Sequence, residues 1–251
     1  MFATSNCRFA GAALLLALPL AGLAQIENAV FAAHAEKELA AAREQFHAAP
    51  AAAEMACDFG RACFDRAEFA TNHTQRAMLA MEGIAAMREL TTRKPKLAAG
   101  HYYLAMNLGQ LARTKMLGAL KIVEEMEREF KIAHDLDERL NFAGPDRNLG
   151  ELYFQAPGWP TSIGSRHKAR ERLERAAALA PEYPENRLNL LEACLQWNDK
   201  KGMQREFKAM RELWPGARAS FTGEKWASCW ADWEARRAAL EAQAQKTLKP
   251  R

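Results

Sequence analysis

Small and large apolar residues recur at helical spacing between Leu149 and Pro215, and the pattern occurs twice in this stretch. Leu173 lies eight residues before Pro181, and Phe207 lies eight residues before Pro215, so the period is 34 residues. A small residue lets two helices approach closely, a large apolar residue fills the gap between them, and a proline ends the second helix. The pattern therefore predicts helical hairpins that stack upon one another.

This spacing resembles that of the tetratricopeptide repeat, in which L-G-x-x-Y marks the first helix and proline follows the second. The matching residues are Leu149, Gly150, Tyr153, Ala169, Leu173, Ala176 and Pro181. Similar spacing elsewhere gives four predicted hairpins, at residues 53–95, 98–137, 143–181 and 184–215. The first three carry insertions of about seven to eleven residues between their helices.

Two further helices are predicted to flank the hairpins. One spans residues 26–48 and ends before Pro50, and the other runs from Glu224 to about Lys246 after a loop at residues 217–223. The sequence has no β-branched runs typical of strands, and Ala, Leu, Glu, Arg and Lys dominate. We therefore expect an all-α fold, a tetratricopeptide-like helical hairpin solenoid of about four repeats in one domain from residue 25 to residue 251.

The first 24 residues have the pattern of a secretory signal peptide. Arg8 gives a positively charged start, an apolar run extends from Ala10 to Leu23, and small residues precede a cleavage site before Gln25. The alternative is an uncleaved membrane anchor, but the run is shorter than the roughly 20 residues that span a bilayer. Cys7 lies before the run, so a lipobox cysteine is not evident. We expect an exported, soluble, periplasmic protein.

Four cysteines follow the signal segment: Cys57, Cys63, Cys194 and Cys229. An oxidising compartment permits disulfides. Cys57 and Cys63, however, would lie about 9 Å apart along one helix, beyond bridging range. We interpret the cysteines as small buried apolar residues, and a disulfide between Cys194 and Cys229 stays open as the alternative.

The candidate binding residues lie on the predicted first helices, which line the concave face in tetratricopeptide proteins. That resemblance implies a face with apolar contact for affinity and sparse polar groups for orientation. The expected residues, with one from a loop, are Arg61, Phe64, Tyr102, Met106, Gln110, Arg147, Glu151, Phe154, Gln155, Trp159, Glu192 and Gln196. The alternative is a solvated inner face with no specific ligand.

Trp159 lies in the insertion at residues 156–165, which is rich in proline and glycine. Long loops in compact folds are often functional, and tryptophan is a preferred anchor at protein interfaces. The alternative is that the loop folds back and seals its own hairpin.

A more specific resemblance rests on four stretches. They are Gly144-Pro145-Asp146-Arg147-Asn148-Leu149-Gly150-Glu151-Leu152-Tyr153, then Ala156-Pro157-Gly158-Trp159-Pro160, then the segment from Ala169 to Pro181, and, earlier in the chain, Ala99-Gly100-His101-Tyr102-Tyr103-Leu104-Ala105. Together they resemble the T component of TRAP transporters. The resemblance implies a periplasmic helical-repeat protein that partners a substrate-binding protein, forms a trimer and contacts an apolar small ligand. Two features depart from the family: the lipobox cysteine is missing, and the segment after Pro215 has no match.

Catalytic spacing is absent from the sequence. It contains no H-E-x-x-H, G-x-S-x-G or paired C-x-x-C motif, and its six histidines are scattered. We expect no catalytic residue, no metal site and no cofactor. The net charge of +4 is too weak and too dispersed to indicate nucleic-acid binding. The alternative function is a hydrolase-like enzyme on a helical scaffold, which would need a convergent set of His, Glu and Asp.

Overall fold

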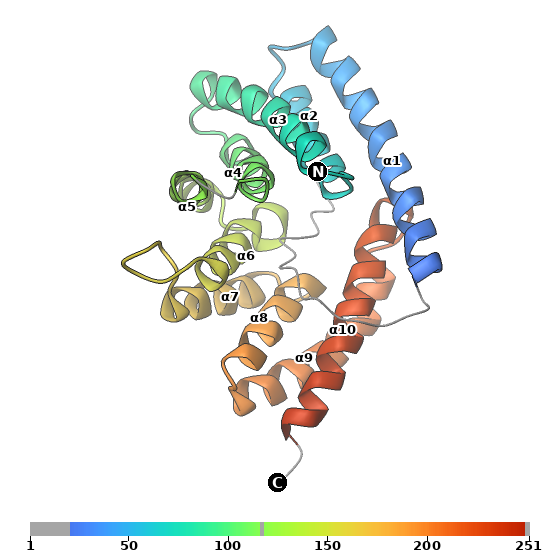
Figure 1. Ribbon diagram of the computed structural model, residues 1–251, viewed down its shortest axis with the longest axis vertical. Coiled ribbons are helices and arrows are strands. Elements are labelled where there is room, and N and C mark those ends of the chain that lie inside the picture. Colours follow the sequence, from blue (N-terminus) through green and yellow to red (C-terminus); the bar gives the residue numbers. More distant parts are fainter. Residues whose placement is uncertain (1–20, 116–117, 249–251) are drawn as a thin grey trace. The chain divides into compact units, whose positions relative to one another are not determined.

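The computed structural model describes residues 21–115 and 118–248, and their side chains from residue 28 to residue 247. This part of the chain contains ten α-helices, one short 3-10 turn and no β-strand (Figure 1). The elements are α1 (Ala21–Ala48), α2 (Ala53–Glu68), α3 (His73–Arg93), α4 (Ala98–Ala112), α5 (Ala119–Leu136), α6 (Leu140–Gln155), α7 (Arg166–Leu179), α8 (Pro184–Gln196), α9 (Lys200–Ser220), η1 (Glu224–Trp226) and α10 (Ala227–Leu248). The expected all-α fold of helical hairpins is confirmed.

The described helices form two compact units that divide between Asp137 and Glu138. In the N-terminal unit α1 packs on α2, and α2 to α5 pack in succession. In the C-terminal unit α6 to α9 pack in succession, and α10 packs on α8 and α9. Within each unit Figure 1 shows neighbours in sequence lying side by side. The single domain from residue 25 to residue 251 stays a prediction.

Two of the hairpins, α2–α3 and α6–α7, close where a glycine of the first helix meets a large side chain of the second. A Cβ atom added to Gly150 would lie 2.7 Å from Leu173 Cγ, and one added to Gly60 would lie 2.7 Å from Met87 Sδ. Both large side chains are almost fully buried. The predicted small-to-large contact therefore exists in both units, and it explains why these helices approach so closely.

The start of α6 departs from a regular helix. Asn141, Phe142 and Ala143 have φ values of 50°, 57° and 60°, in the left-handed region. Such a conformation costs on the order of 1–2 kcal/mol per residue without glycine. The regular helix therefore begins at Gly144 and Pro145, where the sequence predicts the start of the third hairpin.

The predicted end of the fourth hairpin is wrong. Pro215 lies inside α9, and the helix continues to Ser220 through most of the loop expected at residues 217–223. Proline removes one backbone hydrogen bond from a helix interior. Here the Pro215 ring is exposed, whereas Trp214 and Ala217 on either side of it are buried. Packing of these neighbours holds the last turn in spite of the lost bond.

Aromatic side chains fill the core between α8 and the C-terminal helix. Trp226 and Trp233 are buried, and their rings lie 4.8 Å and 5.9 Å from that of Phe221. Tyr183 brings the start of α8 into this cluster, with its ring 5.4 Å from that of Trp233. Aromatic pairs of this kind add roughly 0.5–1.5 kcal/mol each beyond the area they bury. The predicted final helix thus packs as a cap on the hairpins of this unit.

All four cysteines in the described part of the chain are buried thiols, and none of them forms a disulfide. Burial raises the pKa of Cys57 to about 12 and that of Cys194 to about 11. Their interpretation as small buried apolar residues is confirmed, and the alternative Cys194–Cys229 bridge does not form.

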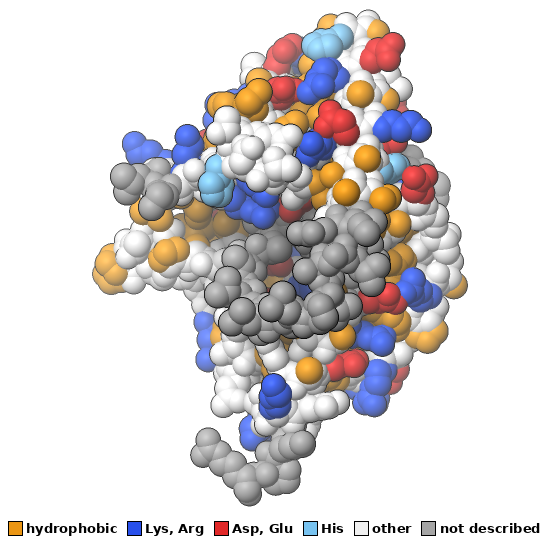
Figure 2. All heavy atoms as spheres, turned by 45° about the vertical axis from the view of Figure 1, so that its right-hand side comes forward, with side chains coloured by type: hydrophobic (Ala, Val, Ile, Leu, Met, Phe, Trp, Pro, Cys, Tyr) orange, Lys and Arg blue, Asp and Glu red, His pale blue; other side chains and the backbone are white. Residues whose placement is uncertain are grey.

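No helix in the described residues is both long enough and apolar enough to cross a membrane. Residues 1–20 of the predicted signal segment lie outside the described residues, and residues 21–24 belong to α1. The signal segment therefore stays a prediction. On the face drawn in Figure 2, acidic and basic side chains of the described residues are interspersed.

Candidate functional site

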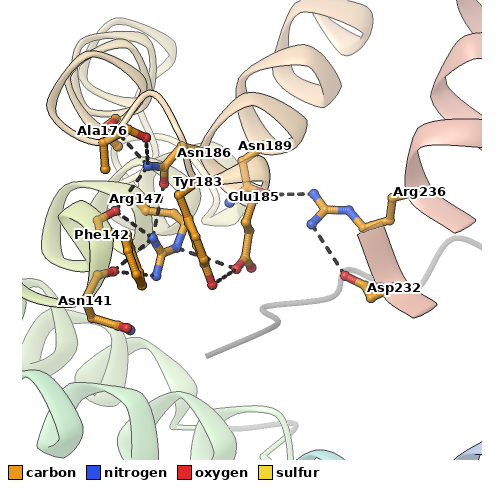
Figure 3. A network of polar contacts seen from close by, with 11 residues as sticks. Asn141, Phe142, Arg147, Ala176, Tyr183, Glu185, Asn186, Asn189, Asp232 and Arg236 are labelled. Atoms are coloured by element: carbon orange, nitrogen blue, oxygen red, sulfur yellow. Dashed lines mark hydrogen bonds and ion pairs between the residues drawn. The ribbon is translucent and has the colours of Figure 1, made fainter. Parts of the chain in front are cut away.

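Arg147 of α6 holds the left-handed turn at the start of its own helix. Its Nη1 donates to the carbonyl oxygen of Phe142 at 3.1 Å and to Asn186 Oδ1 of α8 at 3.1 Å. Asn186 Nδ2 in turn donates to the carbonyl oxygens of Phe142 and Ala176, each at 3.1 Å (Figure 3). It also donates to the carbonyl oxygen of Ala180 at 3.1 Å. These bonds satisfy carbonyl groups that the irregular turn and the end of α7 leave exposed.

The Arg147 guanidinium is buried, with 1% of the residue exposed. It stacks over the Tyr183 ring at 4.9 Å, and its Nε lies 3.9 Å from Glu185 Oε2. Tyr183 donates its hydroxyl to the same carboxylate oxygen at 3.2 Å. Through these contacts Arg147 joins α6 to α8. Its expected role as a ligand-facing residue stays a prediction.

A second cation, Arg236 of α10, faces α8. Its Nη2 donates to Asn189 Oδ1 at 2.6 Å, and its Nη1 lies 3.8 Å from Asp232 Oδ2 (Figure 3). The same Nη2 also donates to Glu192 Oε2 at 3.0 Å. The nearby carboxylates come from three helices. We call them and the arginine between them the acidic cluster: Glu151, Glu185, Glu192, Asp232 and Arg236.

Burial dominates the electrostatics of Glu151 in this cluster. The pKa of its carboxyl group is raised to about 8: burial is the largest cause, Glu185 and Glu192 act in the same direction, and Arg236 and Arg147 oppose them. For Arg236 burial lowers the pKa, but the surrounding carboxylates outweigh burial and raise it overall. Three of the predicted residues, Arg147, Glu151 and Glu192, are therefore coupled within one charged network.

The Trp159 loop gives a separate candidate surface on the C-terminal unit. Trp159 is 89% exposed, so it does not seal its own hairpin. Next to this loop, a pocket of about 260 Å³ is lined by Phe154, Gln196 and Trp197 among other residues. The rings of Phe154 and Trp197 meet edge to face at 5.6 Å, and Arg166 lies over Trp197 at 5.3 Å. Two predicted residues, Phe154 and Gln196, thus meet in this pocket.

The predicted residues of the N-terminal unit have different surroundings. Phe64, Tyr102 and Met106 are buried among the core residues of that unit, so they do not present an apolar surface. Gln110 accepts a hydrogen bond from Arg76 Nη1 at 2.6 Å and donates to Glu68, and 1% of it is exposed.

Arg61 pairs with Asp58 of the same helix at 2.9 Å. Burial raises the pKa of the neighbouring Asp65 to about 7, with Arg61 opposing this shift. Charged groups therefore gather on this side of α2, but only Arg61 among the predicted residues of this unit remains partly exposed.

Asn189, Asp232 and Arg236 were not among the residues predicted from the sequence. Asp232 and Arg236 stand four residues apart on α10, a spacing that places them on one helix face. This spacing is visible in the sequence, but the candidate residues were chosen from the repeat pattern, which does not extend to α10. In the described residues, no group of three or more His, Cys, Asp or Glu side chains could hold a metal ion.

Comparisons with known proteins identify a similar fold but no family and no close relative. No known protein family matches the sequence, and no curated protein matches it. The crystal structure of a thermophilic TPR protein in Thermus thermophilus is similar, with a TM-score of 0.52 and 18% sequence identity. The match covers 83% of this chain and 99% of that one. This likeness and the stacked hairpins define a tetratricopeptide-like helical fold.

Proposed function

We propose that this chain is a non-catalytic binding protein that holds a protein partner on the first-helix side of its hairpins. The observation that carries this proposal is the convergence of Glu151, Glu192 and Arg236 from three different helices. Isolated surface charges would point into solvent separately, whereas convergent charges provide orientation and specificity for a partner. Tetratricopeptide-like folds offer extended binding surfaces of this kind.

In its specific form, the proposal is an exported T component that associates with a TRAP-type substrate-binding protein. The support is the sequence resemblance between Gly144 and Pro181, with its proline-containing loop. The exposed side chain of Trp159 adds to it, because a solvent-facing tryptophan is a typical interface anchor. A trimer and a periplasmic location belong to the same proposal.

The C-terminal unit offers a candidate location for the apolar small ligand implied by the resemblance. The pocket of about 260 Å³ beside the Trp159 loop has aromatic walls from Phe154 and Trp197. Aromatic walls with a few polar groups suit a small ligand that is mainly apolar.

A hydrolase-like enzyme is the second candidate function. The observation that favours it is the Glu151 carboxyl group, whose raised pKa of about 8 is typical of an acid–base catalyst. Against it, the sole histidine of the C-terminal unit is His167, which is exposed on α7. The cluster therefore supplies carboxylates and guanidinium groups, and a binding role fits them better.

The test is capture of a partner by the immobilised chain of residues 25–251 from periplasmic extract. We expect mass spectrometry to identify a substrate-binding protein, which must then bind the chain as a purified pair. Native mass spectrometry of the chain should also reveal any small apolar molecule that it carries. Recovery of no partner and no bound molecule would contradict the proposal, and hydrolysis of ester or glycoside substrates that Glu151→Gln abolishes would favour the enzyme.

A further inference from the structure

Carboxylates outnumber cations around Arg236. Burial lowers the pKa of this guanidinium, and the charges of Asp232, Glu192, Glu185 and Glu151 raise it. Arg147 is the second cation of the network, and it is already bonded to backbone and to Asn186. Among the described residues, the acidic cluster together with Arg147 therefore has four carboxylates for two guanidinium groups, which favours a further positive charge.

The shortage of positive charge is clearest at Glu151. Only 7% of it is exposed, and it forms no hydrogen bond or ion pair with the described residues. A buried ionised carboxylate without a partner is costly. It requires either a proton or a cation supplied from outside the unit.

The amide group of Asn189 provides an independent observation. Its Oδ1 accepts from Arg236, which places the side chain inside the cluster (Figure 3). Its Nδ2 is buried and has no acceptor among the described residues, although only 3% of Asn189 is exposed. A buried amide donor without an acceptor is rare in native structures. It calls for a ligand that offers a carbonyl oxygen next to a positive charge.

We propose that the acidic cluster binds an extended segment of a partner protein through one of its Lys or Arg side chains. The cationic group pairs with Glu151 and Glu192, and a neighbouring backbone carbonyl of the segment accepts a hydrogen bond from Asn189 Nδ2. The cluster is open to solvent at Glu192, whose side chain is 43% exposed, and at Arg236, whose side chain is 21% exposed. This inference rests on the proposed function, and it specifies the chemistry of the partner.

A metal ion fits this cluster less well than a basic side chain. Arg236 already occupies the space between Glu192 and Asp232, with contacts of 3.0 Å and 3.8 Å. The carboxylates thus surround an organic cation and do not converge on one point. A guanidinium or ammonium group of a partner extends the same arrangement outward.

Proton release accompanies binding in this arrangement. The pKa of Glu151 is raised to about 8 by burial and by Glu185 and Glu192 of α8, against Arg236 of α10 and Arg147 of α6. On α7, which also packs against α6, Arg172 and Arg175 pair with Asp146 and not with Glu151. A bound cation favours the ionised carboxylate, so affinity should rise as the pH increases through this pKa.

The test is calorimetric titration of the full chain with the peptide acetyl-(Gly-Arg)₄-amide. The control peptide replaces arginine by citrulline, which keeps the shape and the backbone carbonyls but has no charge. We expect the arginine peptide to bind about tenfold or more tightly than the citrulline peptide, and to bind more tightly near pH 9 than near pH 6. Glu192→Gln should weaken binding of the arginine peptide about tenfold, and Glu151→Gln should remove the pH dependence.

The matched control variant is Glu212→Gln on α9, an exposed carboxylate whose side chain is 67% exposed and lies 4.0 Å from Lys208. It should leave the affinity unchanged. Equal binding of both peptides, or equal effects of Glu192→Gln and Glu212→Gln, would overturn the inference. If a captured partner binds all these variants with the same affinity, the proposed function stands and this inference fails. If no partner exists but the arginine peptide binds as expected, the cluster is a cation site and the proposed function fails.

Discussion

The Leu173 side chain of α7 occupies the space that a side chain on Gly150 of α6 would need. A Cβ atom at residue 150 would lie 2.7 Å from Leu173 Cγ, and Leu173 itself is 1% exposed. This contact closes the hairpin that carries both Glu151 and the Trp159 loop. The stability of the candidate sites therefore depends on it.

Replacing Leu173 by alanine should lower the free energy of unfolding by roughly 2–5 kcal/mol, because it leaves a cavity between α6 and α7. Urea denaturation followed by circular dichroism measures this change. Replacing the exposed Glu212 by alanine is the control and should change the free energy of unfolding by less than about 0.5 kcal/mol. Equal stability of the Leu173 variant and the wild type would mean that this side chain is not in the core.

Replacing Gly150 by alanine should destabilise the protein by roughly 1–3 kcal/mol, because the added methyl group overpacks the same contact. The chain offers a matched control in Gly216 of α9, where an added Cβ would meet nothing within 4 Å. Alanine there should stabilise the helix by roughly 0.5–1 kcal/mol, since glycine is a poor helix former. Thermal melts of the two variants should therefore shift in opposite directions.

Replacing Arg147 by alanine should lower the free energy of unfolding by roughly 3–5 kcal/mol. The change removes the cation beside the buried Glu185 carboxylate and the hydrogen bonds that hold the turn at residues 141–143. Gln155 is exposed, so its alanine variant should retain full stability. Chemical denaturation of both variants checks this contrast. If the Arg147 variant is as stable as the wild type, the turn is held by other contacts.

The hairpins were predictable because they depend on local spacing. Gly150 and Leu173 signal the hairpin by residue size alone, and the structure confirms their contact. The surroundings of Arg147 could not be predicted in this way, because they depend on a turn whose φ values are positive without glycine. Position along the first helix also failed to separate Tyr102, which is buried, from Gln155, which is exposed. Burial of those positions depends on the neighbouring helices, which differ between the hairpins.

Stability should fall as the pH rises from about 4.5 to about 8. The pKa of Glu151 is raised from 4.5 to about 8 in the folded chain. In that window the folded state binds more protons than the unfolded state, so the free energy of unfolding decreases with pH. Asp65 acts in the same direction, with a pKa of about 7 against an ordinary value of 3.8.

The variant Glu151→Gln isolates the contribution of that one carboxyl group. Its unfolding free energy, measured by urea denaturation at a series of pH values, should fall less steeply than that of the wild type. The difference between the two proteins should be largest above about pH 8. Parallel curves for both proteins would show that Glu151 ionises as easily in the folded chain as in the unfolded one.

Replacing Trp159 by alanine should weaken binding of the captured partner about tenfold or more while leaving the fold intact. The side chain is 89% exposed, so its removal takes almost no buried surface from the folded chain, and unfolding free energy should change by less than about 0.5 kcal/mol. A tryptophan that becomes buried at an interface commonly contributes about 2 kcal/mol or more to binding. Biolayer interferometry with the purified partner measures the affinity. Replacing Met81 of α3, an exposed apolar residue of the N-terminal unit, by alanine is the matched control. If both variants bind the partner equally well, the exposed tryptophan does not mark the interface.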